Sequence, residues 1–481
     1  IPPAELQGYL NSLPALAEYR HVVEEMELLR PHTLSKQEER LLAMSSEMAQ
    51  AADDIYSMLT DADLRFPSVT LPDGQRQEIT HGRYLSLMRH SDREVRRQTF
   101  EAYYATYKGL ENTLSATLSS SIKKDLFYAR ARRYDSALEA SLAPNRVPVS
   151  VYESLIAAVR AALPDLHRYM ALRKRVMGVE ELHMYDLYTT LVPEADLQVR
   201  YEEGKAWVLA GLAPLGSEYI KQVKAAFDAR WVDVYENRGK TSGAYSWGVW
   251  GAHPYVLMNW QDDVNHVFTL AHEMGHAMHS YLSDKHQSYV NAGYPLLLAE
   301  VASTCNEALL MQHLLATRED PKLRLCLLND YLEQFRTTLF RQTMFAEFEL
   351  IAHRKAEAGE PLTPEAFCQI YRQLNVDYYG PDVVVDEEID MEWSRIPHFY
   401  RAYYVYQYAT GFASAIALSR QVLSGEGGRD RYLRFLSSGN RDFPLTLLQE
   451  AGVDLTQPQA VQQALDTFRE RVEEMERYFS T

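Results

Sequence analysis

The chain has 481 residues, of which 46% are hydrophobic and 24% charged, a composition typical of folded proteins and not of disordered ones. Its formal net charge of −17 gives an average field that repels phosphate backbones and anionic lipids, which argues against nucleic acid and membrane surfaces as partners. Three cysteines without a CxxC pair predict no disulfide framework and a reducing, cytoplasmic location. We find no uncharged apolar run of about 18 residues, the length that a membrane span needs.

Most of the chain is predicted to be helical. Apolar residues recur at spacings of three and four, the period of an amphipathic helix, in residues 37–63, 94–133 and 152–177. Strand signals are few, with a hairpin turn expected at Asp73-Gly74. The predicted fold class is therefore mainly α with a small β-sheet. We divide the chain into an N-terminal helical region and a long second domain, at residues 1–90 and 91–481.

A segment rich in glycine and aromatic residues, SGAYSWGVWGAHP at 242–254, interrupts the helical pattern. One interpretation is an ordinary loop that leads into a strand. The other is a flap over a cleft, followed by an edge strand at 254–259 that pairs with an extended peptide.

The helix expected over residues 264–282 contains the sequence HEMGH. His272 and His276 are four residues apart, so both imidazoles lie on one side of the helix and can bind one ion. Zinc accepts neutral imidazole nitrogens, and a neighbouring carboxylate that is not a ligand, here Glu273, can take a proton from water. At this composition roughly 0.06 such matches arise by chance. The pattern therefore favours a catalytic metal over a structural histidine pair.

A third ligand is expected in the apolar segment at 296–315. Glu300 stands among leucines, where an unpaired carboxylate is costly and a metal ion would compensate it. Glu307 lies seven residues later on the same face, which suggests that it supports the site from behind the ligands. The alternative is that Glu300 pairs with an Arg or Lys elsewhere. Two histidines and one glutamate leave the fourth zinc position for water, as in catalytic sites.

Other histidines near HEMGH fit the ligand set less well. His279 lies about 10 Å along the helix from His272, too far to share an ion, so we expect it to pack or to support the site. Leu282 occupies the position where a metzincin has its third histidine.

A tyrosine-rich segment at 391–412 supplies neutral donors, which suit a site where negative charge develops on a carbonyl oxygen. The alternative is an aromatic core helix, because three of its tyrosines are spaced at four. The candidate donors are His398, Tyr400, Tyr403, Tyr404, Tyr406 and Tyr408.

The motifs HEMGHAMHSY, AEVASTCNE and RIPHFYRAYYVYQYATG, preceded by GAHPYVLMNW, resemble the thimet oligopeptidase family of zinc metallopeptidases, in particular its bacterial oligoendopeptidase F branch. The resemblance runs from residue 34 almost to the C-terminus. It implies two largely helical lobes around a deep channel, with a zincin-like catalytic core in residues 91–481. Members of this branch usually carry a further N-terminal segment, so we expect this chain, which starts at Ile1, to be shortened.

The resemblance also implies roles for individual residues. One Zn²⁺ would be held by His272, His276 and Glu300, with Glu273 as the general base. The family's oxyanion donors fall on His398, Tyr403 and Tyr406. Further candidates for substrate binding or for support of the site are Tyr400, His253, His279 and Glu307.

The implied activity is zinc-dependent hydrolysis of internal bonds in short unstructured peptides. One alternative is a related zinc carboxypeptidase, which needs a cation to hold the terminal carboxylate. Another is a non-catalytic peptide-binding protein with a vestigial zinc site, against which Glu273 argues because a site that only holds metal needs no base. The sequence predicts neither the cleavage preference nor the oligomeric state.

Overall fold

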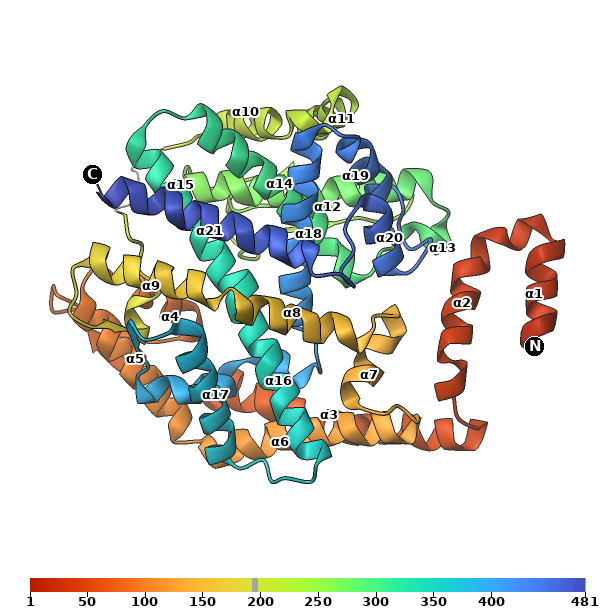
Figure 1. Cartoon of the computed structure of the whole chain (residues 1–481), viewed down its shortest axis with the longest axis horizontal. Coiled ribbons are helices and arrows are strands. Elements are labelled where there is room, and N and C mark those ends of the chain that lie inside the picture. Colours follow the sequence, from red (N-terminus) through yellow and green to blue (C-terminus); the bar gives the residue numbers. More distant parts are fainter. Residues whose placement is uncertain (193–197, 481) are drawn as a thin grey trace.

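The computed structural model describes residues 1–192 and 198–480 and is mainly helical, as the sequence predicts (Figure 1). Its helices are α1 (Pro3–Ser12), α2 (Arg20–Leu29), α3 (Lys36–Ser57), α4 (His81–Met88), α5 (Arg93–Lys108), α6 (Glu111–Ala131), α7 (Ala137–Leu142), α8 (Val149–Ala161), α9 (Leu163–Met177), α10 (Tyr201–Gly211), α11 (Ser217–Asp228), α12 (Val264–His286), α13 (Tyr289–Ala292), α14 (Leu296–Thr317), α15 (Pro321–Gln334), α16 (Arg341–Glu357), α17 (Pro364–Tyr379), α18 (Tyr406–Ser424), α19 (Gly428–Leu436), α20 (Pro444–Ala451) and α21 (Gln459–Ser480).

Two of the predicted helical segments are each split into two helices. The segment at 94–133 is interrupted between α5 and α6, at Gly109 and Leu110. The segment at 152–177 is interrupted at Ala162, because Pro164 stands in the first turn of α9 and has no N–H to continue the hydrogen-bond ladder of α8. The hydrophobic period is shared by both halves of each pair, so periodicity alone does not show the break.

Three small sheets accompany the helices. The predicted hairpin is present, since β1 (Ser68–Thr70) and β2 (Arg76–Glu78) pair antiparallel across the Asp73-Gly74 turn. A second sheet pairs β3 (Leu182–His183) with β7 (Val383–Val384) in parallel. The third has the order β4-β6-β5, with strands Val232–Asp233, Tyr255–Leu257 and Tyr245–Trp247.

The order of the third sheet corrects the expectation of an edge strand at 254–259. β6, which covers this segment, lies in the centre of the sheet, and both of its edges are occupied by β4 and β5. The edge strand that lies within the segment at 242–254 is therefore β5, and β4 forms the other edge.

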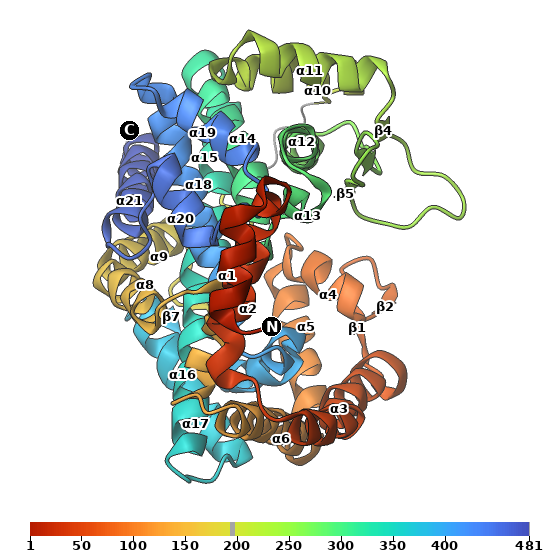
Figure 2. The ribbon, with the colours of Figure 1, turned by 90° about the vertical axis from the view of Figure 1, so that its right-hand side faces the viewer.

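The helices gather towards two ends of the molecule. Figures 1 and 2 show α10, α11, α12 and α14 at one end and α3, α6 and α17 at the other, with α8 and α16 between them. One hydrophobic core runs through both parts and includes residues from Tyr56 to Met475. The division of the chain near residue 90 stays a prediction.

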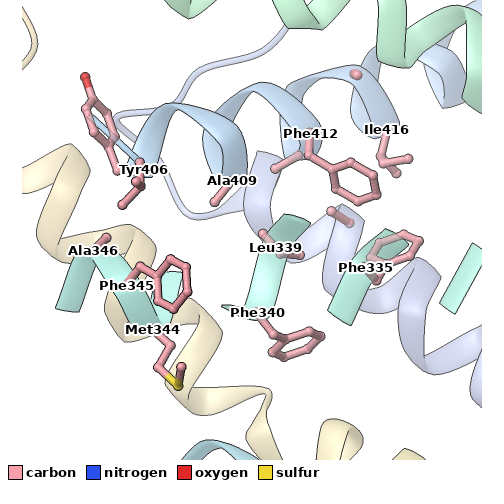
Figure 3. Packing of buried hydrophobic residues seen from close by; sticks show 14 of the residues in the cluster. Phe335, Leu339, Phe340, Met344, Phe345, Ala346, Tyr406, Ala409, Phe412 and Ile416 are labelled. Atoms are coloured by element: carbon pink, nitrogen blue, oxygen red, sulfur yellow. The ribbon is translucent and has the colours of Figure 1, made fainter. Parts of the chain in front are cut away.

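The central helix of this core is α18, which packs on the π-helical segment η7 (Phe335–Phe340) that leads into α16. In Figure 3, Phe412 and Ile416 of α18 face the side chains of Phe335 and Leu339. The rings of Phe335 and Phe412 meet edge to face, with centroids 4.8 Å apart. This packing holds α18 in place beside α14.

None of the helices within residues 1–192 and 198–480 combines the length and hydropathy that a bilayer crossing demands.

Candidate metal centre and active site

The two histidines of HEMGH lie on the third and fourth turns of α12. Asp263 caps the helix, because its side chain accepts a hydrogen bond from the backbone N–H of His266. The imidazole rings of His272 and His276 are 4.8 Å apart between centroids, on one face. The helix geometry predicted from their spacing is therefore present.

The glycine of HEMGH lets α14 approach α12 closely. A Cβ atom on Gly275 would lie 2.6 Å from Cα of Ser303 and 2.7 Å from the carbonyl oxygen of Ala302, both backbone atoms of α14. No side chain fits between the two helices at this point. This close approach brings the first turns of α14, which carry Glu300, against the histidines.

Glu300 completes a cluster of three metal-ligand side chains. Its Oε2 lies 3.5 Å from Nε2 of His272 and 3.7 Å from Nε2 of His276, and the ligand atoms of all three lie within 4.8 Å of one another. Ligands at about 2.1 Å from a tetrahedral zinc are about 3.4 Å apart, so this donor set fits one zinc ion. Among the described residues no Arg or Lys pairs with Glu300, which removes the alternative of an ordinary ion pair.

Glu307 orients the first histidine. Its Oε1 lies 2.6 Å from Nδ1 of His272, and its other oxygen accepts a hydrogen bond from Gln334. In the neutral ring, the form that binds a metal, Nδ1–H donates to this carboxylate and the lone pair is on Nε2, which lies nearest to Glu300. Although burial lowers the pKa of His272, the carboxylates of Glu307 and Glu300 raise it to about 9. The predicted supporting contact of Glu307 is thus present in the structure.

Glu273 lies beside the cluster without joining it. Only 6% of the residue is exposed, and its Oε2 has no hydrogen-bond partner among the described residues. Burial raises the pKa of Glu273 to about 7, with a further increase from the charge of Glu300 and a decrease from His272. A carboxyl group with a pKa near neutral and a free oxygen can take up and release a proton.

His398 lies with two tyrosines of the tyrosine-rich segment. Its Nε2 is 3.4 Å from the hydroxyl of Tyr408, which is 3.4 Å from the hydroxyl of Tyr404. Burial and the guanidinium of Arg401 lower the pKa of His398, which favours the neutral imidazole. The three polar groups therefore form one neutral donor cluster.

This donor cluster faces Glu300. Burial, the Tyr404 hydroxyl and the negative charge of Glu300 all raise the pKa of Tyr408. Gly411, three residues further along α18, lies where a Cβ atom would be 3.8 Å from Cβ of Glu300. Residues three apart share a helix face, so the face of α18 that carries Tyr408 is the one turned to the metal ligands.

The structure places Tyr403 and Tyr406, two of the donors expected from the sequence, in the aromatic core. Both are only 2% exposed, and their rings contact Tyr152 of α8 at centroid distances of 5.4 and 5.2 Å. The ring of Tyr403 also packs on His353. None of the described contacts of these two rings reaches the metal ligands.

Tyr400 is also placed away from the cluster. Its hydroxyl lies 2.7 Å from Oγ1 of Thr117, and its ring stacks on Tyr56 with centroids 4.3 Å apart. Thr117 lies on α6 and Tyr56 on α3, at the end of the molecule opposite to α12 and α14. Tyr400 therefore anchors the segment that carries His398 to helices α3 and α6.

The remaining histidine candidates are packed against aromatic rings. His279 stacks on Tyr294 at 3.7 Å between centroids, and burial lowers its pKa to about 3, so it is neutral and packs. His253 stacks on Trp231 at 5.1 Å and its Nδ1 lies 2.8 Å from the carbonyl oxygen of Pro254. The structure joins neither of them to the metal ligands by a described contact.

Sequence reasoning missed two contributions. Tyr404 and Tyr408 were among the candidates in the segment but were not chosen, and their spacing of four residues was the available signal for a shared helix face. Gly275 was not considered, because its role depends on the distance to a second helix.

Residues 86–467 match Peptidase family M3. Residues 1–66 match the N-terminal family described as Oligopeptidase F. The chain belongs to peptidase family M3. Members of this family are metallopeptidases, and the cluster of two histidines and a glutamate is consistent with that chemistry.

Similar proteins and a similar crystal structure belong to the same group of oligopeptidases. The chain is 50% identical to oligopeptidase PepF of Bacillus subtilis over 473 residues, which cover 98% of this chain and 71% of that protein. It is 42% identical to group B oligopeptidase PepB of Streptococcus agalactiae, covering 98% and 79% of the two chains. The crystal structure of oligoendopeptidase F from Enterococcus faecium matches with a TM-score of 0.85 at 39% identity, covering 100% of this chain and 81% of that one.

Proposed function

We propose that this M3 peptidase is a zinc-dependent oligoendopeptidase that hydrolyses internal bonds of short unstructured peptides. His272, His276 and Glu300 hold the zinc ion, and Glu273 is the general base. The observation that carries the proposal is the convergence of these three ligand atoms within 4.8 Å beside a buried carboxylate that is not a ligand. A site that only stores metal has no use for such a carboxylate.

Glu273 carries out the proton transfers of the proposed reaction, and Glu307 orients the ring of His272. When bound, zinc lowers the pKa of a water molecule and polarises the carbonyl group of the peptide. Glu273 removes a proton from the attacking water through its unpaired oxygen and then delivers it to the leaving amine. Glu307 keeps the His272 ring in the tautomer that leaves Nε2 free.

The oxyanion is stabilised by neutral donors from the other side of the site. We assign this role to Tyr408, Tyr404 and His398, in place of the buried Tyr403 and Tyr406. A phenol hydroxyl donates a hydrogen bond without adding charge beside Glu300. The Tyr408 hydroxyl lies between His398 and Tyr404, and both tyrosine hydroxyls can rotate toward a substrate carbonyl.

The substrate backbone is held at the free edge of β5. Among the described residues, Tyr245–Trp247 pair with β6 and with no second strand, so their outward N–H and C=O groups are available to an extended peptide. The next residue, Gly248, sits directly on Ser280 of α12. Because pairing of this kind needs an unfolded backbone, it selects flexible peptides over folded proteins.

The proposal is tested with a quenched fluorescent peptide of about eight residues, blocked at both ends. We expect interior cleavage that a chelator abolishes and added zinc restores. Cleavage only of peptides with a free C-terminus would identify a zinc carboxypeptidase instead. Zinc-loaded protein that cleaves neither kind of peptide would refute the catalytic assignment.

A further inference from the structure

The sheet next to the metal centre carries a group of exposed aromatic side chains that the proposed mechanism does not use. Tyr245 and Trp247 of β5 are 47% and 66% exposed, and Tyr255 of β6 is 56% exposed. Trp247 pairs directly with Tyr255 across the two strands. Large exposed aromatic residues in one place commonly mark a binding surface. We call these three residues the aromatic face.

The aromatic face is one side of the sheet, and the other side is buried. Successive residues of a strand point to opposite faces, so Ser246 and Val256 point away from the aromatic face. Val256 is 2% exposed, and the hydroxyl of Ser246 is buried. Both strands contact α12, which covers this buried side. The aromatic face is therefore left to solvent by the fold itself.

The end of β5 lies on the metal-binding side of α12. A Cβ atom on Gly248 would be 2.6 Å from Cβ of Ser280, so the loop after β5 rests on that serine. Ser280 is four residues after His276, which places it on the same helix face about 6 Å further along the axis. A peptide held at the edge of β5 thus passes close to the scissile position.

We propose that the aromatic face selects substrates with aromatic or large apolar side chains, an inference that rests on the proposed function. A peptide paired with β5 places alternate side chains on the two faces of the extended sheet. Those on the solvent side lie beside Tyr245 and Trp247, at the spacing of about 5 Å between Cβ atoms that cross-strand neighbours have. Tyr255 is the cross-strand neighbour of Trp247 on β6 and adds a third aromatic side chain to the same face.

The chemistry of these side chains determines the preferred substrate. Neither Tyr245 nor Trp247 carries a charge, and the neighbouring exposed residues Val249 and Trp250 are also apolar. Pairs of aromatic rings stabilise each other by enough to change an affinity about three- to tenfold. A carboxylate or ammonium at the same position of the peptide gains no such contact.

The test compares kcat/KM for blocked peptides that differ at one position, with Phe, Ala or Glu placed at each position in turn and the cleaved bond identified by mass spectrometry. At one or two positions we expect the wild-type protein to prefer Phe over Ala by about three- to tenfold. Trp247→Ala should bring that ratio close to one, because it lowers kcat/KM for the Phe peptide more than for the Ala peptide. Trp247→Phe should keep the preference. Phe127→Ala, which removes an exposed aromatic side chain of α6, is the matched control and should change neither value.

The outcomes separate this inference from the proposed function. A Phe preference that survives in both Trp247→Ala and Tyr245→Ala overturns the inference, as does a wild-type protein without any preference. An equal loss of activity on all peptides also overturns it, because the side chains would then support the site as a whole. Absence of cleavage of every blocked peptide by zinc-loaded wild type refutes the proposed function itself.

Discussion

The contact between α12 and α14 at Gly275 provides a sharp test of how the fold builds the metal centre. In the variant Gly275→Ala, the added methyl group would lie 2.6 and 2.7 Å from backbone atoms of Ser303 and Ala302. Carbon atoms in ordinary contact are about 3.5–4.0 Å apart, so the helices must separate by about 1 Å. Overpacking of this kind destabilises a protein by about 1–3 kcal/mol.

The separation acts directly on the ligand set. Glu300 belongs to α14 and both histidines to α12, so a shift of about 1 Å opens the distances of 3.5 and 3.7 Å that now suit one ion. We expect zinc affinity to fall at least as far as when a supporting contact of a metal site is removed, about 10- to 100-fold. The measurement is competition for zinc with a chromogenic chelator, with thermal melting of the zinc-free protein recorded in parallel.

Gly411→Ala is the matched control. A Cβ atom at Gly411 would lie 3.8 Å from Cβ of Glu300, an ordinary contact, and glycine in a helix interior is less favourable than alanine. This variant should keep its zinc affinity and should melt at the same or a higher temperature. A Gly275→Ala protein that binds zinc as the wild type does would refute the argument that helix proximity builds the site.

Three further predictions follow from individual side chains. Glu273→Gln should bind zinc normally and lose activity by about 10²- to 10⁴-fold, measured as kcat beside zinc content, because it removes the general base; retained turnover would contradict the assignment. Tyr408→Phe should lower kcat by about 10²-fold or more while Tyr406→Phe leaves kcat within a few fold, because only the former reaches the Glu300 side; the reverse order would restore the sequence-based choice. Glu392 is buried, yet Arg341 and Arg395 hold its pKa at about 2. Because this pKa lies below its unfolded value of about 4.3, its stabilisation is present above that pH and is lost as the pH falls toward 2. Glu392→Gln should cost about 3–5 kcal/mol of unfolding free energy near pH 6 and much less near pH 2.5, measured by urea denaturation; an equal cost at both pH values would contradict the pairing.

The sequence by itself determined the local part of the metal centre. The spacing of His272 and His276 needs only an α-helix to place both rings on one side, and the apolar pattern around them predicts that helix. Glu300 was also identifiable, because a carboxylate among leucines requires a compensating charge. Glu307 follows from a spacing of seven on the same helix. Each of these inferences depends on one helix or on the character of one segment.

The tertiary structure decided which tyrosines face the metal. Tyr403 has a left-handed backbone, with φ of +52°, and its N–H donates to the buried carboxylate of Glu349 at 2.9 Å. This turn stands directly before α18, whose Tyr408 is near enough to Glu300 for the carboxylate charge to raise the pKa of the tyrosine. The hydrogen bond between Tyr403 and Glu349 joins residues 54 positions apart, so no local period of the sequence indicates it.

Strand order and helix proximity were likewise beyond the sequence. The apolar run at 254–259 is a strand in either case, and only its pairing with both β4 and β5 makes it central and leaves β5 at the edge. The role of Gly275 exists only because Ser303 of a second helix lies against it. Local patterns thus specified which side chains are available for chemistry, whereas contacts between distant segments decided which of them meet, because packing is settled by the whole set of neighbours.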